Sequence, residues 1–395
     1  MAEREVVVLS AVRTAIGKFG GGLKDVPPTV LAAKVVQESV QRSGLNPEAI
    51  GHAVFGNVIH TDSKDMYVSR VAAVRGGLPL TTPALTLNRL CGSGLQAIVT
   101  AADLICRDQC DAAVAGGVEA MSRAPYWMPT LRWGARLNDA AAIDVLVASI
   151  TDPFENVHMG ITAENVARRF NVSRQAQDCL AVESHRRAIA AIQAGRFVDQ
   201  IVPIEVKAKG GSVQIAQDES PRADATPENL GKLRPAFRED GTVTPGNASS
   251  INDGAAAVTL MERSAANRLG LKPMARLVDY SVTGVDPDIM GMGPVSAVRK
   301  LFDRTGLSVA DMDVIELNEA FAAQAIAVQR ELLLPVDKTN PNGSGISLGH
   351  PIGATGAIIT VKALYELQRI GGHYALVTMC IGGGQGIAAI FESIN

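Results

Sequence analysis

Cys91 stands at the junction between an extended segment and a predicted helix. It is followed by Gly92-Ser93-Gly94, and apolar residues then recur at helical spacing from residue 95 to residue 105. The glycines leave room for a substrate to approach, and Ser93 is a candidate helix cap. The N–H groups and the dipole at a helix start favour a thiolate and can hold a developing oxyanion. Cys91 is therefore a candidate nucleophile, although a buried core cysteine explains this stretch equally well.

Three more polar or thiol residues lie at positions where a side chain could take part in catalysis. Asn318 follows an apolar strand and precedes a predicted helix, and α/β proteins bind ligands at such strand ends. His350 lies in a glycine-rich loop, with Pro351 at the predicted first position of a helix. Cys380 ends an apolar strand that runs into the glycines of 382–384. Each also has an ordinary explanation, because strand-end cysteines usually pack in cores and loop histidines are usually solvated.

Other residues of these types are assigned structural roles. Cys106 and Cys110 are spaced like metal ligands, but no second pair matches them, so no metal site is predicted. The glycines of 382–384 lack the Lys-Ser/Thr of a phosphate loop and the helix of a dinucleotide fingerprint. The remaining histidines are taken as solvated or packed: His52, His60, His185 and His373.

Composition narrows the class of protein. Among 395 residues, 47% are apolar, 4% are aromatic and 38 are glycine, which predicts an α/β fold with a core of small aliphatic side chains. A net charge of −3 and the absence of a basic run exclude a nucleic-acid partner. Five cysteines with no secretory signal predict reduced thiols in the cytosol. No apolar run is long enough for a bilayer, so we expect a cytoplasmic protein without a membrane partner.

Strands and helices alternate, and their order recurs later in the chain. Strands are predicted at 5–10, 53–57 and 112–116, with helices at 31–43 and after Cys91, which indicates a sheet covered on both faces. Three segments, 42–57, 93–98 and 112–115, resemble later segments displaced by about 262 residues, which indicates two related halves.

We therefore expect three parts. The first half is 1–120, completed by about 250–272, and the second half is 273–395. Between them, 121–249 is an inserted domain with helices at 162–170 and 173–194 and exposed loops at 207–241, rather than a third sheet. The stretch 249–261 is predicted to return to a helix and a strand of the first half.

Six motifs together resemble the thiolases, and more narrowly the bacterial short-chain β-ketothiolase and acetyl-CoA acetyltransferase group. In order along nearly the whole chain they are Asn88-Arg-Leu-Cys91-Gly-Ser-Gly-Leu, His158-Met159-Gly-Ile-Thr-Ala-Glu-Asn, Asn247-Ala-Ser249, Asn318-Glu-Ala-Phe-Ala, Gly349-His350-Pro351-Ile-Gly-Ala-Thr-Gly and Cys380-Ile-Gly-Gly-Gly-Gln-Gly. The resemblance implies a five-layered αβαβα core of two related halves with an inserted loop domain. It also implies a homotetramer arranged as a dimer of dimers.

The resemblance further implies a role for each catalytic residue. Cys91 would accept the acyl group, His350 would activate it, and Cys380 would deprotonate the methyl group of acetyl-CoA. Asn318, through a water, and His350 would hold the enolate oxygen, while the N–H groups of Cys91 and Gly382 would hold the acyl oxyanion. A sulfur suits this exchange because it is both nucleophile and leaving group, and a second base is needed because the first sulfur is acylated during condensation.

The implied reaction is the reversible Claisen condensation of acetyl-CoA with acetyl-CoA or propionyl-CoA, through an acyl-cysteine in a ping-pong mechanism. Its reverse is thiolysis, and the reaction serves fatty acid metabolism or the synthesis of polyhydroxyalkanoate precursors. Coenzyme A thioesters are substrates, and no permanently bound cofactor or metal is expected. The residues implied in coenzyme A binding are His158, Met159, Arg222, Leu233, Phe237, Ser249, Met290 and Phe321.

Two positions depart from the family pattern. Asn229 replaces a serine that some members place near the adenine, and Ser250 replaces a glycine of many members.

The segment 121–139 carries apolar residues that a monomer's surface loop rarely exposes, which predicts a contact between subunits. These residues are Trp127, Met128, Leu131 and Trp133.

Two other functions fit part of the pattern. A decarboxylating ketoacyl synthase shares the fold and the nucleophile, but uses His-His or His-Asn where this chain has Cys380. A non-catalytic lipid carrier or scaffold on the same fold would not need Cys91, Asn318, His350 and Cys380 together. The preferred acyl-chain length stays open, because it depends on the shape of the pocket.

Overall fold

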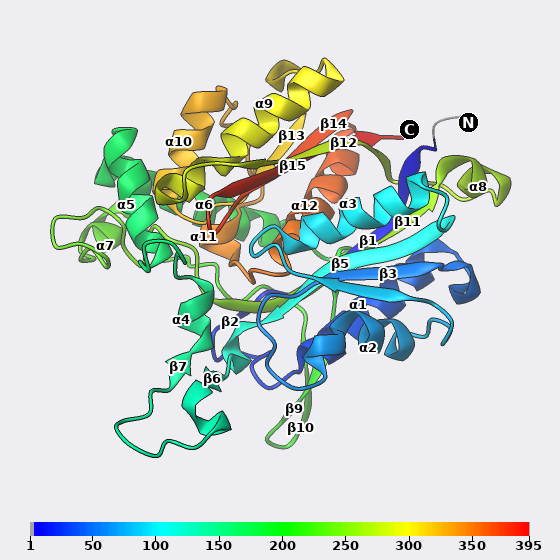
Figure 1. The fold of residues 1–395 in the computed structure, drawn as a ribbon. Coiled ribbons are helices and arrows are strands. Elements are labelled where there is room, and N and C mark those ends of the chain that lie inside the picture. The colour runs from blue at the N-terminus through cyan, green and yellow to red at the C-terminus, as the bar shows by residue number, and fades with distance from the viewer. Residues whose placement is uncertain (1–3, 395) are drawn as a thin grey trace.

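The computed structural model describes residues 4–394, which fold around one large mixed sheet (Figure 1). Its strands run in the order β13-β14-β15-β12-β1-β11-β5-β3-β4, with β2 paired to β11 and β8 paired to β1. The strands before residue 270 are β1 (Val6–Thr14), β2 (Gly17–Lys18), β3 (His52–Gly56), β4 (Ala84–Leu87), β5 (Ala112–Ala120), β8 (Ile201–Val202) and β11 (Asn252–Glu262). Those after it are β12 (Ala275–Gly284), β13 (Val314–Leu317), β14 (Tyr374–Ile381) and β15 (Gln385–Ser393).

The sheet repeats the same pairing outward from its centre. β1 and β12 meet through only two residue pairs, Val7 with Arg276 and Val8 with Ala275. On one side, β1, β11 and β5 pair antiparallel and β5 pairs parallel with β3. On the other, β12, β15 and β14 pair antiparallel and β14 pairs parallel with β13.

Helices form three layers around the two sides of the sheet (Figure 1). Buried side chains of α3 (Ser93–Cys106) and α12 (Thr355–Ile370) share one core with β1, β5, β14 and β15, so these two helices form the middle layer. On one outer face, α1 (Pro28–Ser43), α2 (Val68–Arg75) and α8 (Arg263–Arg268) cover the first strands. On the other, α9 (Gly293–Thr305) and α10 (Ala322–Leu332) cover the last strands. The predicted α/β class is confirmed.

The two middle helices cross at a pair of glycines. A Cβ on Gly94 would lie 2.6 Å from the backbone nitrogen of Ala357, and one on Gly356 would lie 2.4 Å from that of Leu95. Only a residue without a side chain permits this approach. The crossing therefore brings the turn before α3, which holds Cys91, next to the turn before α12, which holds His350.

The residues between β5 and β11 project from this core. Figure 1 shows α5 (Met159–Arg169) and α7 (Pro227–Gly231) to one side of the sheet, and the hairpin β6 (Tyr126–Trp127) and β7 (Ile143–Asp144) reaching outward below it. The other elements here are α4 (Val145–Ser149), α6 (Arg174–Gln193), β9 (Ile204–Ala208) and β10 (Gly211–Ile215). Two 3-10 helices also lie between β5 and β11: η3 (Met121–Arg123) and η4 (Pro129–Arg132). Short elements elsewhere in the chain are α11 (Gly345–Leu348) and the 3-10 helices η1 (Pro47–Ala49), η2 (Asp65–Tyr67), η5 (Pro287–Met292) and η6 (Val309–Asp311).

Four local predictions are wrong. The stretch 249–261 holds no helix, because Asn252–Glu262 is a wholly buried strand between β1 and β5, whose small residues suit a position packed on both faces. Pro351 does not begin a helix: its carbonyl accepts from the nitrogens of Ala354 and Thr355 in a turn, and α12 begins at Thr355. Ser93 is not the cap of α3, since Gly92 holds that position. The segment 207–241 contributes to a two-stranded sheet, β9 with β10, rather than loops alone.

Within residues 4–394, no helix is both long and apolar enough to cross a membrane.

Candidate active site

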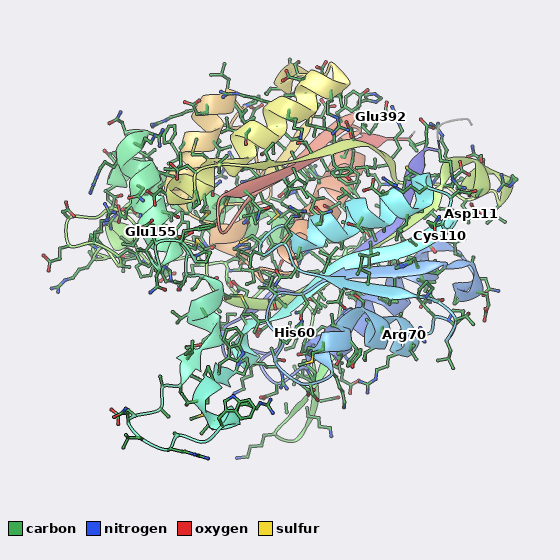
Figure 2. All side chains as sticks on the ribbon, in the orientation of Figure 1. His60, Arg70, Cys110, Asp111, Glu155 and Glu392 are labelled. Carbon is green, nitrogen blue, oxygen red and sulfur yellow. The ribbon has the colours of Figure 1, made fainter. Side chains whose placement is uncertain are left out.

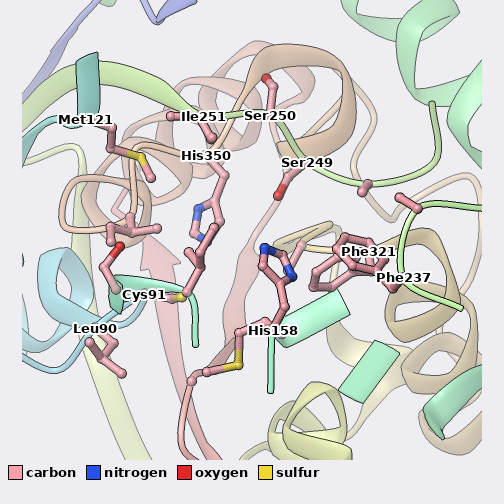
Figure 3. Close-up of a pocket in the computed structure, with 18 of the residues that line it drawn as sticks. Leu90, Cys91, Met121, His158, Phe237, Ser249, Ser250, Ile251, Phe321 and His350 are labelled. Carbon is pink, nitrogen blue, oxygen red and sulfur yellow. The ribbon is translucent and has the colours of Figure 1, made fainter. Parts of the chain in front are cut away.

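A mostly apolar cavity of about 260 Å³ lies where both sides of the core meet the inserted residues (Figure 3). Most of the predicted site residues line it, and they come from eight separate stretches of the chain. Those that line it are Cys91, His158, Met159, Phe237, Ser249, Met290, Phe321, His350 and Gly382. Asn318 and Cys380 are buried close by, whereas Arg222 and Leu233 line a neighbouring cavity.

The turn before α3 holds Cys91 by hydrogen bonds of Ser93. The Ser93 hydroxyl accepts from the Arg89 nitrogen at 2.8 Å and donates to the Leu90 carbonyl at 2.7 Å. Leu90 takes a left-handed conformation with φ of 43°, which is unusual for a residue that is neither glycine nor asparagine. The serine therefore fixes the nucleophile's turn instead of capping the helix.

Burial decides the protonation of Cys91. It raises the pKa of the thiol to about 11, while the backbone N–H groups of Gly382 and of Cys91 itself act in the opposite direction. The N–H groups favour the thiolate, as expected, but desolvation opposes them and has the larger effect on the pKa. Cys91 is a thiol near neutral pH and needs a base, and two N–H groups already face its sulfur.

His350 is buried and its hydrogen bonds assign its tautomer. Its Nδ1 lies 2.6 Å from the Thr355 hydroxyl oxygen, and that hydroxyl donates to the Pro351 carbonyl at 2.9 Å. The hydroxyl hydrogen is thus engaged, so Nδ1 carries the proton and Nε2 keeps its lone pair. Burial lowers the pKa of His350 to about 4, which keeps the ring neutral. Its Nε2 is a base at neutral pH.

Asn318 shares the buried space around that nitrogen. Its Nδ2 lies 3.5 Å from His350 Nε2, and its backbone nitrogen donates to the Thr378 carbonyl at 3.1 Å, which fixes it beside β14. Among residues 4–394, its Oδ1 finds no hydrogen-bond partner. A Cβ on Gly345 would lie 2.7 Å from that oxygen, so glycine is required to leave room there.

Cys380 lies near the end of β14, packed among Met159, Met290 and Phe321. Burial raises the pKa of its thiol well above the usual range, and the nearby sulfur of Cys91 raises it further. After Cys380 the chain turns sharply into β15 through Gly383 and Gly384, whose φ values are 79° and 84°. The Cys380 sulfur is thus buried next to the cavity but does not line it.

Two polar residues that sequence reasoning missed hold the His350 loop. Glu119 accepts from the nitrogens of Gly353 at 2.8 Å, Val58 at 3.1 Å and Ile59 at 3.0 Å. Burial raises the pKa of Glu119 to about 8, but donors surround both oxygens, so the arrangement fits the carboxylate. Asn252 Oδ1 accepts from the His350 nitrogen at 2.9 Å. A charged residue within the apolar strand β5 was the available signal for Glu119.

Aromatic rings cover the other end of the cavity (Figure 3). His158 stacks on Phe237 with ring centres 4.6 Å apart, and Phe237 meets Phe321 edge-on at 6.5 Å. His158 Nδ1 accepts from the Gly160 nitrogen at 3.0 Å, so its Nε2 carries the proton. Gly160 is needed here, because a Cβ would lie 2.3 Å from the Phe237 ring.

The neighbouring cavity of about 700 Å³ continues the first one. The two share Pro245, Ala248, Ser250 and Ile251 as lining. Arg222 and Leu233 line it, together with Lys18 and Asn229. The predicted ligand residues therefore divide between two connected spaces, one apolar and one with cationic side chains.

The remaining cysteines lie outside this site. Cys106 ends α3, and Cys110 stands beside Asp111 before β5 (Figure 2). Burial raises the pKa of Cys110 to about 11. No group of three or more His, Cys, Asp or Glu side chains within residues 4–394 is placed to hold a metal ion.

Two family models match the chain. "Thiolase, N-terminal domain" matches residues 6–264 and "Thiolase, C-terminal domain" matches residues 271–393. The chain is 62% identical over 392 residues to the beta-ketothiolase BktB of Cupriavidus necator, covering 99% of this chain and 100% of that protein.

Solved structures agree with this match. The acetyl-CoA acetyltransferase of Bacillus anthracis superposes with a TM-score of 0.98 at 46% identity and covers 100% of both chains. The human mitochondrial 3-ketoacyl-CoA thiolase in complex with CoA superposes with a TM-score of 0.96 at 44% identity, covering 99% of this chain and 98% of that one. The thiolase-like fold predicted from the motifs is confirmed.

Proposed function

Because this chain belongs to the thiolase family, we propose that it joins acetyl-CoA to acetyl-CoA or propionyl-CoA by a reversible Claisen condensation. The products are a 3-ketoacyl-CoA and free coenzyme A, and the reverse reaction is thiolysis. One observation carries the proposal: Cys91 and the neutral base His350 line one buried cavity, with a second thiol, Cys380, directly behind it. Coenzyme A thioesters are its substrates, and it needs no bound metal or permanent cofactor.

In the first half-reaction, His350 Nε2 takes the proton of the Cys91 thiol. The thiolate attacks the thioester carbonyl, the C–S bond to coenzyme A breaks, and the proton passes to the departing sulfur. The N–H groups of Cys91 and Gly382, which face the Cys91 sulfur, hold the oxyanion of the tetrahedral intermediate. This step leaves an acyl group on Cys91 and gives the reaction its ping-pong order.

In the second half-reaction, the Cys380 thiol gives its proton to His350 Nε2, and the resulting thiolate removes a proton from the methyl group of acetyl-CoA. Asn318, through a water, and His350 with its proton on Nε2 hold the enolate oxygen. The enolate carbon then attacks the acyl carbonyl, a C–C bond forms, and Cys91 leaves as a thiolate that is reprotonated. The raised pKa of Cys380 suits this step, because the thiolate of a weak acid is a strong base.

Coenzyme A would span the two connected cavities. His158, Phe237 and Phe321 cover the apolar end, which suits the pantetheine arm. Arg222 and Lys18 line the second cavity, where cations suit the phosphates of the nucleotide. The other contacts proposed are Met159, Leu233, Ser249 and Met290.

The domain division and the assembly also belong to the proposal. Residues 1–120 with 250–272 form one half, 273–395 form the other, and 121–249 form the inserted domain. The matching strand order on the two sides of β1 and β12 supports this division. We propose a cytoplasmic homotetramer in which the loop 121–139 makes contacts, since Trp133 and Trp127 are 84% and 54% exposed.

The decisive experiment separates the two sulfurs. Radiolabelled acetyl-CoA should label Cys91 in the wild-type protein and in Cys380→Ala, but not in Cys91→Ser. In Cys380→Ala, exchange of the methyl protons of acetyl-CoA with deuterated solvent and condensation should both fall by about two to four orders of magnitude. Label on Cys380 or on Cys106, Cys110 or Cys179 alone would contradict the proposal. Equal losses of acylation and exchange in folded Cys380→Ala would show that Cys380 is not the second base.

A further inference from the structure

Asn252 begins β11 and joins the His350 loop to three other segments of the chain. It is fully buried, and all four hydrogen-bonding positions of its amide are occupied. Its Oδ1 accepts from the His350 nitrogen at 2.9 Å and from the Ser250 hydroxyl at 2.8 Å. Its Nδ2 donates to the Gly17 carbonyl and to the Ser220 hydroxyl, both at 3.0 Å. Because the His350 N–H can only donate and the Gly17 carbonyl can only accept, these contacts determine which way the amide points.

The backbone just before His350 has a conformation that needs this support. Gly349 has a φ of 114° and a ψ of 167°, values that only glycine adopts readily. A Cβ on Gly349 would lie 2.4 Å from the Cγ of Asn252, so the amide packs directly against this glycine. Such a conformation persists only where the surrounding structure holds it. The Asn252 amide does so from one side, because it packs on Gly349 and accepts from the His350 nitrogen.

A second contact fixes the ring of His350 on the other side of the turn. The Thr355 hydroxyl accepts from Nδ1 and sets the rotation of the imidazole, while Asn252 sets the position of the backbone that carries it. Thr355 begins α12, directly after the loop, whereas Asn252 lies 98 residues before His350 in the chain. Figure 3 shows His350 in the cavity near Ser250 and Ile251, the residues that lead into β11.

The contact with β11 ties the base to the part of the sheet that carries the nucleophile. β11 pairs with β5, β5 with β3, and β3 with β4, the strand that leads to the Cys91 turn. His350 comes from a loop before α12, but its nitrogen bonds to this side of the sheet. A base must lie within about 2.6–3.2 Å of the group whose proton it takes, so a shift of about 1 Å between the two turns would interrupt the transfer.

We propose that Asn252 is a positioning residue for the base: by fixing the His350 nitrogen to β11, it holds His350 Nε2 within reach of the Cys91 thiol. Asn252 does not line the catalytic cavity and acts only through His350. Because His350 serves both half-reactions, loss of this contact slows the acylation of Cys91 and the exchange of methyl protons alike. Loss of Cys380 slows exchange and condensation but not acylation. The inference rests on the thiolase activity proposed above.

The test measures the base without coenzyme A. Iodoacetamide alkylates a thiolate, so its rate at Cys91 near neutral pH depends on proton removal by His350. Asn252→Leu keeps the size of the side chain without its hydrogen bonds. Alkylation of Cys91 in this variant should be about 10- to 100-fold slower than in the wild type, the cost of a base displaced by about 1 Å. Acylation by radiolabelled acetyl-CoA and exchange of its methyl protons should fall by a similar factor. Mass spectrometry of the Cys91 peptide separates this reaction from that of the exposed Cys106 and Cys179.

Further variants separate positioning from packing. Asn252→Asp keeps an oxygen opposite the His350 nitrogen, but its second oxygen faces the Gly17 carbonyl, so its alkylation rate should lie between those of the wild type and Asn252→Leu. The matched control is Thr259→Val on the same strand, where a buried hydroxyl loses its 2.8 Å hydrogen bond to Ser39. Cys91 in this control should react at the wild-type rate. Asn252→Ala serves if the leucine variant fails to fold.

Several outcomes would overturn the inference. Wild-type alkylation of Cys91 in folded Asn252→Leu is one, and an aspartate variant no faster than the leucine variant is another. An equal loss in Thr259→Val would show that any loosening of β11 has the same effect. Loss of exchange without loss of acylation would connect Asn252 with Cys380 instead of His350. Failure of acetyl-CoA to label Cys91 in the wild type would instead remove the proposed thiolase activity, and the alkylation rates, which need no coenzyme A, distinguish the two failures.

Discussion

Thr355 determines which nitrogen of His350 is the base. Its hydroxyl accepts from Nδ1 while it donates to the Pro351 carbonyl, which leaves Nε2 free to take the Cys91 proton. When Nε2 takes up a proton, as the condensation step requires, Nδ1 keeps its own proton and the hydroxyl goes on accepting from it. One side chain thus serves both forms of the ring, and only a residue with a hydroxyl can do so.

We predict that Thr355→Val lowers kcat/KM for thiolysis about 10- to 100-fold, because the isosteric side chain leaves the Nδ1 proton without an acceptor. Thr355→Ser should recover most of the activity, since it restores the hydroxyl. Steady-state kinetics of both variants, with thermal unfolding as a check on folding, make the measurement. A serine variant as inactive as the valine variant would show that packing, and not the hydroxyl, is what Thr355 supplies.

The catalytic motif residues could be predicted from the sequence, but the residues that hold them in place by hydrogen bonds could not. Cys91 and His350 stand in motifs of adjacent residues, so short stretches of sequence identify them. Glu119 lies more than 200 residues from Gly353 and holds it only in the folded chain. The effect of burial on the pKa of Cys91 could not be read from the sequence either, because burial is a property of the whole fold.

The crossing of α3 and α12 is the contact that sets the active-site turns side by side. Gly94 and Gly356 approach the backbone of the opposite helix so closely that neither can carry a side chain without displacing it. The helices themselves were predictable from apolar spacing, yet their starts were not, since Pro351 forms a turn before α12 rather than its first residue. A turn that carries catalytic residues often departs from the local sequence rules for a helix start, because its conformation is set by the site.

We predict that Gly94→Ala destabilises the protein by about 1–3 kcal/mol, because the added methyl group forces the two helices apart. Thiolysis should fall as well, since the shift moves Cys91 relative to His350. The control is Gly231→Ala in α7, where a Cβ would have no neighbour within 4 Å. Urea unfolding of both variants compares them, and similar stability changes would contradict the assigned role of the crossing.

Exposed tryptophans on the loop 121–139 bear on how copies of the chain assemble. Trp133 and Leu131 are 84% and 55% exposed, in a loop that reaches away from the sheet (Figure 1). Large apolar side chains in such a position are typical of surfaces that another protein covers. The sequence indicated this loop by composition alone, whereas its reach away from the core appears only in the folded structure.

We predict a tetramer by light scattering at micromolar concentration and a smaller assembly in the double variant Trp127→Ser, Trp133→Ser. Acylation of Cys91 should persist in that variant, because neither tryptophan lines the catalytic cavity. Val198→Ser is the control, since Val198 is 70% exposed but lies outside the loop. A wild-type monomer would contradict the prediction, as would an equal change in the control.

The reciprocal contact of Gly94 with Ala357 and of Gly356 with Leu95 has a consequence for what the two turns can carry. The Cys91 turn precedes α3 and the His350 turn precedes α12, on either side of that crossing. Two identical chains that met in this way would carry the same residue in both turns. Here one polypeptide supplies both turns, so one can hold the nucleophile and the other its base.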